Sequence, residues 1–125
     1  MKKNILIVDD SPTMRASVKF TLTEKGYDVE TAENGLDGIK KLKTIQAEGN
    51  ETLMIISDVN MPEMDGFTFV RIIKKTPFSE IPVLFLTTES QESKKMIGKE
   101  VGVAGWLIKP FSPEQLVGVV KRFVK

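Results

Sequence analysis

The chain has 125 residues, with eighteen Lys and Arg against seventeen Asp and Glu, and it contains neither Cys nor His. This length suits one domain, and the net charge of +1 gives no general reason to expect binding to nucleic acid or to an anionic membrane. Without Cys there is no disulfide framework or thiol nucleophile. Without His the chain lacks the usual neutral-pH base, the commonest metal ligand and any phosphohistidine.

The amino-terminal apolar run ends at Asp9 and is too short for a signal sequence, and no apolar run is long enough to span a bilayer. No repeat or linker interrupts the chain. We expect a cytoplasmic protein, without membrane insertion, that forms a single domain over residues 1–125.

The first strand is predicted at Ile5–Val8, an aliphatic run of the kind that is covered on both faces of a sheet. Two acids, Asp9 and Asp10, follow it. Ser11-Pro12 then predicts a helix cap with proline in the first turn, and apolar residues at four-residue spacing continue this helix to Gly26.

Residues 27–31 predict a more polar edge strand, and Asn34-Gly35 opens a second helix. Residues 47–52 are polar and predict a helix terminus and loop. A third, buried strand follows at Leu53–Asp58, and it stops on an acid. The apolar face of the second helix is predicted to contain Leu36, Ile39 and Leu42.

Asp65 can cap a third helix that ends by Pro77, and the apolar run Ile81–Leu86 predicts a fourth strand. Thr87 and Thr88 follow this strand. A fourth helix is predicted from Ser90, and Gly98 weakens its interior. Its apolar residues are Met96, Ile97 and Val101.

Val103–Ile108 predicts the fifth strand, followed by Lys109-Pro110, and residues 112–115 have the form of a capping box that starts the last helix. Five strands that alternate with five helices predict an α/β fold: a doubly wound, five-stranded parallel sheet with helices on both faces.

Polar residues at four strand ends are the main functional signal. In a parallel sheet these ends lie on one edge, so the acids, a hydroxyl and a lysine are expected to converge there. Right-handed crossovers allow few strand orders, and the order 2-1-3-4-5 puts the first and third strands side by side. The converging residues are Asp9, Asp10, Asp58, Thr87 and Lys109.

Three neighbouring carboxylates raise one another's pKa or require a cation, and an oxygen-only ligand set suits Mg²⁺. With Mg²⁺ and Lys109 neutralising phosphoryl oxygens and Thr87 donating a hydrogen bond, Asp58 can attack phosphorus and form an aspartyl phosphate.

The sequence resembles the receiver domains of the two-component response-regulator family, and among them the CheY-like single-domain chemotaxis regulators. The strand order above rests partly on this resemblance, which covers essentially the whole chain. It is carried by Val8-Asp9-Asp10-Ser11, Ser57-Asp58-Val59-Asn60-Met61-Pro62 with Met64-Asp65-Gly66, Leu86-Thr87 and Lys109-Pro110-Phe111.

The resemblance implies that Asp58 accepts phosphate from a histidine kinase. Asp10 and Asp58 would bind Mg²⁺ directly, Asp9 mainly through water, and Asn60 through its backbone carbonyl. Lys109 would contact Asp58 and then the phosphoryl group, with a cis peptide bond before the following proline.

The resemblance further implies that Thr87 moves toward the phosphoryl group and that Trp106 occupies the switch position, where relatives usually carry Tyr or Phe. The indole is larger, so full inward rotation can be hindered. Thr88 stands where many relatives have a smaller residue. The changed surface would comprise the fourth helix, fifth strand and fifth helix, with Ile97, Val101, Lys94, Lys95, Lys99 and Lys121 as candidate members.

The expected output is binding to a separate protein, such as a flagellar motor switch. We expect the receiver to be a monomer, and a separate phosphatase can dephosphorylate it. Asn60 and Glu89 border the path of attacking water in this family, and the pair predicts fast self-dephosphorylation. Apart from self-catalysed phosphotransfer and hydrolysis, we expect no enzymatic turnover.

Other functions remain as alternatives. A single-domain phosphorelay intermediate or scaffold, or a receiver that binds without phosphorylation, fits the same residues. A haloacid-dehalogenase-type phosphatase needs a second acid two residues beyond its nucleophile, where this chain has Asn60. A flavodoxin-like FMN protein needs a phosphate loop after the first strand, where Asp9 and Asp10 would repel phosphate.

Overall fold

The computed structural model describes residues 1–88 and 92–124, and in the second range the side chains from Met96 onward. Strands and helices alternate throughout, as predicted. The elements are β1 (Lys3–Val8), α1 (Pro12–Glu24), β2 (Asp28–Ala32), α2 (Gly35–Ala47), β3 (Glu51–Asp58), α3 (Gly66–Ile73), β4 (Val83–Thr87), α4 (Glu92–Val101), β5 (Gly105–Ile108) and α5 (Pro113–Phe123).

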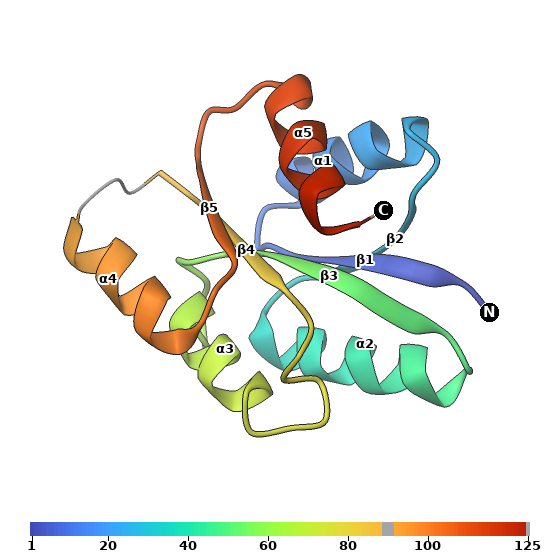
Figure 1. Ribbon diagram of the computed structural model, residues 1–125, viewed down its shortest axis with the longest axis horizontal. Coiled ribbons are helices and arrows are strands. Elements are labelled where there is room, and N and C mark those ends of the chain that lie inside the picture. The colour runs from blue at the N-terminus through green and yellow to red at the C-terminus, as the bar shows by residue number, and fades with distance from the viewer. Residues whose placement is uncertain (89–91, 125) are drawn as a thin grey trace.

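The five strands form one parallel sheet in the order β2-β1-β3-β4-β5, which confirms the predicted fold class and strand order. Helices α1 and α5 cover one face of the sheet, and α2, α3 and α4 cover the other (Figure 1). None of the described helices is both long and apolar enough to cross a membrane. The sheet edge formed by the carboxyl ends of the strands is therefore framed by loops that lead into helices on both faces.

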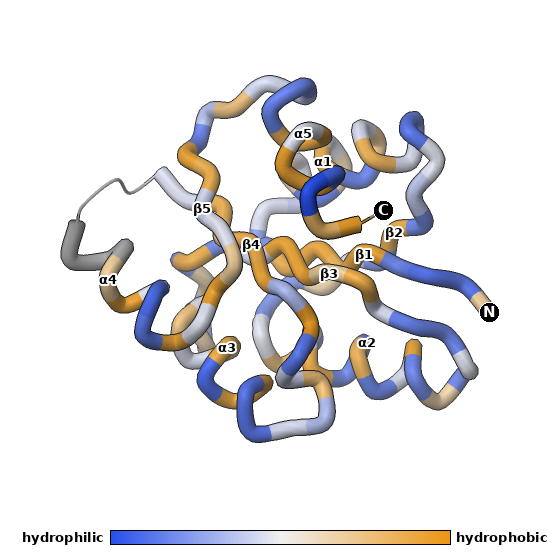
Figure 2. The backbone as a smooth tube through the Cα atoms, in the orientation of Figure 1, coloured by the Kyte–Doolittle hydropathy of each residue, from blue (hydrophilic) through white to orange (hydrophobic). Residues whose placement is uncertain are grey.

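The core consists of two apolar layers, one on each side of the sheet. Successive residues of β1 alternate between them, with Leu6 and Val8 in the layer under α2, α3 and α4, and Ile5 and Ile7 in the layer under α1 and α5. The hydropathy colouring shows the apolar interior of β1, β3 and β4 (Figure 2). The three central strands are therefore packed between apolar layers on both faces up to their carboxyl ends.

Several strand boundaries differ from the prediction. β3 begins at Glu51 rather than Leu53, because the N–H of Glu51 donates to the carbonyl of Lys2 at 2.9 Å and extends the pairing with β1. β5 begins at Gly105 rather than Val103, since the N–H of Val103 instead donates to the carbonyl of Gly98 and closes α4. β2 begins at residue 28 rather than 27, and β4 begins at residue 83 rather than 81. The predicted position of β2 at an edge of the sheet is confirmed.

The apolar face assigned to α2 was wrong at Leu36, which is 49% exposed. The buried face of this helix instead includes Gly35 and Gly38. A Cβ at Gly38 would lie 3.1 Å from the Phe69 ring, so the glycines let α2 approach α3 and β1 closely. On α4, Met96 is likewise exposed, whereas Ile97 and Val101 pack against the core. The predicted helix start at Ser90 lies outside the described residues.

Side-chain caps fix where the helices begin after the strand ends. The Ser11 Oγ accepts the Met14 N–H at 3.2 Å, and the Asp65 Oδ1 accepts the Thr68 N–H at 2.8 Å. Ser112 and Gln115 form the predicted capping box at the start of α5. These caps confirm the predicted helix starts and hold the loops that carry the candidate site residues.

Candidate functional site

The strand ends bring the predicted site residues to one edge of the sheet. Val8 pairs with Ser57 across β1 and β3, Asp58 pairs with Leu86 across β3 and β4, and Thr87 pairs with Ile108 across β4 and β5. The residues that end or follow these four neighbouring strands are Asp9, Asp10, Asp58, Thr87 and Lys109. The expected convergence is thus present in the fold.

Three carboxylates gather at this edge. Asp9, Asp10 and Asp58 each offer an oxygen atom, and the three atoms lie within 4.8 Å of one another. Asp9 is 1% exposed and Asp58 is 8% exposed, whereas Asp10 faces solvent. Two largely desolvated acids and one exposed acid therefore surround a common point.

Lys109 supplies a positive charge to the same cluster. Its Nζ atom lies 3.3 Å from Oδ2 of Asp9 and 3.6 Å from Oδ2 of Asp58. The Lys109 N–H donates to the carbonyl of Thr87 at 2.8 Å, which fixes the backbone where the chain leaves β5. The Lys109-Pro110 peptide bond is cis, as the resemblance implied.

The environment of Asp58 makes its ionised form less favourable than it is in water. Burial raises the pKa of this carboxyl, and the charge of Asp9 raises it further. Lys109 and the backbone N–H groups of Asn60 and Val59 act in the opposite direction but do not cancel the effect of burial. A cation at this position would compensate the charge that Lys109 leaves unbalanced.

The donor set fits a hard divalent cation. All three side chains offer carboxylate oxygens, and the chain contains no His or Cys that would favour zinc or copper. Asn60 is exposed and lies two residues beyond Asp58, with its N–H directed to the Asp58 carboxylate. The proposed contribution of its carbonyl oxygen to a cation stays a prediction.

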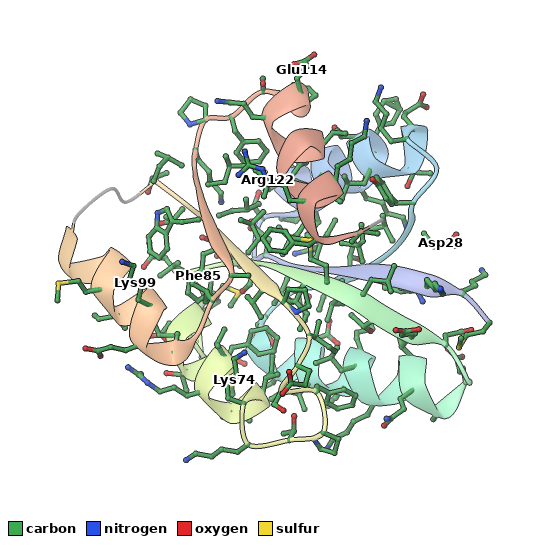
Figure 3. The ribbon with its side chains drawn as sticks, in the orientation of Figure 1. Asp28, Lys74, Phe85, Lys99, Glu114 and Arg122 are labelled. Atoms are coloured by element: carbon green, nitrogen blue, oxygen red, sulfur yellow. The ribbon has the colours of Figure 1, made fainter. Side chains whose placement is uncertain are left out.

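Thr87 and Trp106, the two predicted switch residues, occupy different environments. Thr87 is completely buried at the end of β4, whereas the adjacent Thr88 is exposed. Trp106 is half-buried and packs edge to face on Phe85, with ring centroids 5.6 Å apart. The Phe85 side chain extends from β4 on the side of α3 and α4 (Figure 3). The roles of Thr87 and Trp106 in switching stay predictions.

The sequence did not indicate two close contacts with the backbone of the site, made by Gly66 and Arg15. A Cβ at Gly66 would lie 2.6 Å from the carbonyl oxygen of Asp58, and the Gly66 N–H donates to the carbonyl of Val59 at 2.7 Å. The Nη1 atom of Arg15 donates to the main-chain carbonyl of Asp9 at 2.6 Å. Gly66 belongs to a motif that supports the family resemblance. The hydrophobic periodicity of the sequence, however, gives no sign of the contact made by Gly66 or of the one made by Arg15.

The residues assigned to the candidate output surface differ in their exposure. Val101 is 7% exposed and belongs to the core, so its assignment to a surface was wrong. Ile97 is half-buried against the same core layer, while Lys99 and Lys121 are exposed. Glu89 and the side chains of Lys94 and Lys95 lie outside what the structure describes. Lys99 borders a cavity of about 240 Å³ that is also lined by Val103, Ala104, Gly105 and Trp106.

Comparison with known proteins agrees with this geometry. The family described as the response regulator receiver domain matches residues 5–121. Chemotaxis protein CheY1 of Helicobacter pylori is 39% identical over 114 residues, which cover 90% of this chain and 89% of that protein. The regulatory protein PhoP of Bacillus subtilis, named for alkaline phosphatase synthesis, is 32% identical over 125 residues, but this chain covers 50% of its length.

Solved structures show the same fold. The chemotaxis protein CheY4 of Vibrio cholerae, crystallised at low pH, has a TM-score of 0.89 and 42% identity, with 99% of this chain and 100% of that chain covered. A signal receiver domain of a histidine kinase from Syntrophus aciditrophicus has a TM-score of 0.85 and 37% identity, covering 97% of this chain and 89% of that chain. The chain therefore belongs to the response-regulator receiver family, as a CheY-like receiver that acts in phosphorylation-dependent two-component signalling.

Proposed function

We propose that Asp58 is the phosphoacceptor and that a separate histidine kinase is the donor. The observation that carries this proposal is the placement of a buried carboxylate at the end of β3, 3.6 Å from the Lys109 ammonium and beside two further acids. Residues 1–125 contain no His, so the phosphohistidine of the donor lies outside them.

Asp9, Asp10 and Asp58 would hold Mg²⁺, together with the carbonyl oxygen of Asn60. The bound ion would supply charge neutralisation for the phosphoryl oxygens. Asp9 would act mainly through water, as the resemblance to the family implies, whereas Asp10 faces solvent and is open to direct ligation.

The chemistry is a transfer followed by hydrolysis. An Asp58 carboxylate oxygen attacks phosphorus, the P–N bond to the donor imidazole breaks, and that nitrogen regains its electron pair. Lys109 would then contact the phosphoryl oxygens, and the Thr87 hydroxyl would donate a hydrogen bond to them. Water later attacks phosphorus, which releases inorganic phosphate and restores the carboxylate.

Phosphorylation would change the surface formed by α4, β5 and α5, which a target protein would recognise. Phosphorylation would draw Thr87 toward the phosphoryl group and favour a different packing of Trp106. The exposed Lys99 and Lys121 and the cavity beside Trp106 would form part of the surface that a target protein contacts.

Chemotaxis is the pathway that the relatives favour, since both CheY1 and CheY4 are named as chemotaxis proteins. The target would then be a component such as a flagellar motor switch, and the receiver would act as a cytoplasmic monomer. A phosphatase can assist hydrolysis. The single-domain phosphorelay intermediate or scaffold is the alternative output of the same phosphorylated state.

Incubation with acetyl phosphate and Mg²⁺, followed by mass spectrometry, tests the central step. We expect one added phosphoryl group, which disappears in Asp58→Asn and when EDTA replaces Mg²⁺. Asp65→Asn, at an exposed cap of α3, is the matched control and should still be phosphorylated. Phosphorylation that survives in Asp58→Asn would refute the assignment. The decay of the product in Mg²⁺ then tests the predicted fast self-dephosphorylation, which a lifetime of many hours would contradict.

A further inference from the structure

Arg15 lies early in α1, and its side chain reaches back to the turn that precedes the helix. Its Nη1 atom donates to the main-chain carbonyl of Asp9 at 2.6 Å, while its own N–H donates to the carbonyl of Ser11 at 3.0 Å. A bond from a guanidinium is charge-assisted, and the side chain is half-buried over the turn. Arg15 therefore ties the start of α1 to the end of β1.

The stability of α1 does not explain this arginine. A positive charge near a helix amino terminus is opposed by the helix dipole, and the first turn of α1 contains no acidic residue to offset it. Among the side chains of residues 1–88 and 96–124, Arg15 forms no ion pair with a carboxylate. The contact with the Asp9 carbonyl is what the side chain contributes.

That contact completes the restraint of Asp9. The Asp9 N–H donates to the carbonyl of Ala32 at 3.1 Å, Oδ1 accepts the Ser11 N–H at 2.9 Å, and Oδ2 faces Lys109 at 3.3 Å. The remaining polar group is the carbonyl that Arg15 binds. Because this carbonyl belongs to the planar peptide that joins Asp9 to Asp10, its hydrogen bond sets the orientation of that peptide.

Asp10 depends on this orientation. Its carboxylate is exposed and makes no hydrogen bond or ion pair with any residue that the structure describes. One of its oxygens nevertheless lies within 4.8 Å of oxygens from Asp9 and Asp58. The backbone, rather than a side-chain partner, must therefore direct Asp10 toward the other two acids.

We propose that Arg15 is a positioning residue for the cation site: by holding the Asp9-Asp10 peptide, it keeps the exposed carboxylate of Asp10 facing those of Asp9 and Asp58. This inference rests on the proposed function of the acids as Mg²⁺ ligands. The charge of Arg15 acts in the opposite direction, because a fixed positive charge close to the site repels a cation. Removal of the guanidinium should therefore weaken Mg²⁺ binding if positioning dominates and strengthen it if charge repulsion dominates.

Calorimetric titration of Mg²⁺ into the metal-free protein distinguishes the two effects. Arg15→Met keeps an unbranched stem but loses the charge and the donors, and we expect it to bind Mg²⁺ about tenfold more weakly than the parent, as other outer partners of metal ligands do. Arg15→Lys keeps the charge but loses the planar fork, so binding should weaken to a smaller extent. The control Arg122→Met, on an exposed residue of α5 (Figure 3), should bind like the parent.

Unchanged or tighter binding in Arg15→Met would overturn the inference, and circular dichroism of each variant verifies that it is folded. If Arg15→Met does not fold, Arg15→Lys decides: weaker binding supports positioning, because the charge is retained, and unchanged binding overturns it. If the parent itself binds no Mg²⁺, the proposed metal site fails and this inference fails with it. If the parent binds Mg²⁺ and the Arg15 variants bind equally well, only the role of Arg15 is refuted.

Discussion

The Nζ atom of Lys109 lies 3.6 Å from Oδ2 of Asp58, and the same ammonium lies 3.3 Å from Oδ2 of Asp9. One cation is thus shared between two buried carboxylates. The exposed Asp10 adds a third negative charge nearby, so the cluster keeps a net negative charge without a metal. This unbalanced negative charge should lower the stability of the metal-free fold and favour the binding of a cation.

Lys109→Met should destabilise the metal-free protein. The Lys109 side chain is 16% exposed, and its removal leaves the carboxylates of Asp9 and Asp58 without their common partner. Removing one partner of a largely buried ion pair costs about 3 kcal/mol. Urea unfolding in EDTA measures the loss, and Lys121→Met, on an exposed face of α5, is the control with an expected change below about 0.5 kcal/mol. Equal stability of the two variants would contradict this account.

Asp58 gives the stability of the fold a specific pH dependence. Its pKa is raised in the folded protein, mainly by burial, from an ordinary value near 3.8. The folded state therefore binds more protons than the unfolded state above that value, so the contribution of this carboxyl to stability is greatest below pH 3.8 and is lost as pH rises through the folded pKa. Asn at position 58 does not titrate.

Asp58→Asn should therefore be more stable than the parent at neutral pH without metal, and the advantage should shrink as pH falls toward the ordinary carboxyl range. Urea unfolding in EDTA at a series of pH values measures the difference. Glu114→Gln, at an exposed position of α5, controls for the removal of one negative charge elsewhere (Figure 3). A parent that is more stable than Asp58→Asn at neutral pH would show that Lys109 outweighs burial.

The strand ends explain why much of this site could be predicted from sequence. Apolar runs that stop abruptly at Asp9, Asp58 and Lys109 mark both the buried strands and their exit points, and parallel pairing brings such exits to one edge. The positions of the strand ends do not predict which side chains of a helix are exposed. Leu36 was misplaced because glycine lines the buried face of α2, and glycine has no hydrophobic signal.

Arg15 and Gly66 show what a sequence pattern cannot supply. An arginine in an exposed-looking turn of a helix gives no sign that it binds a carbonyl six residues earlier. A glycine after a capping aspartate is compatible with ordinary turn chemistry, and its close approach to the backbone of Asp58 exists only in the folded chain. Val101 was placed on a surface for the same reason, since the packing of α4 decides which of its apolar residues are covered.

Gly66→Ala should damage both the fold and the site. The added Cβ would lie 2.6 Å from the Asp58 carbonyl oxygen and 3.0 Å from the Cα of Val59, and backbone atoms cannot rotate away as a flexible side chain can. Overpacking of this kind costs about 1–3 kcal/mol, and the shift of Asp58 should also slow phosphorylation by acetyl phosphate. Gly118→Ala is the matched control in α5, where a Cβ meets nothing within 4 Å.

The control should gain up to about 1 kcal/mol, because alanine is favoured over glycine inside a helix. Urea unfolding of both variants gives the two free-energy changes. A Gly66→Ala protein as stable and as readily phosphorylated as the parent would mean that the α3 loop adjusts without moving Asp58.

Gly98 and Trp106 provide a test of how α4 is held against β5. A Cβ at Gly98 would lie 3.0 Å from Cζ3 of the Trp106 indole, so this glycine makes room for the larger ring. Gly98→Ala should therefore lose the helix-propensity gain expected of Gly118→Ala, and it should shift the fluorescence emission of Trp106, which is the sole tryptophan of the chain.

In the Trp106→Phe background, the smaller ring should leave space for the alanine. The double-mutant cycle then predicts a coupling free energy of about 1 kcal/mol between positions 98 and 106, measured by urea unfolding of the parent, the two single variants and the double variant. Additive effects would show that the indole moves aside at no cost. In that case Trp106 would not fix the position of α4, and its rotation would have little influence on the surface that α4 presents.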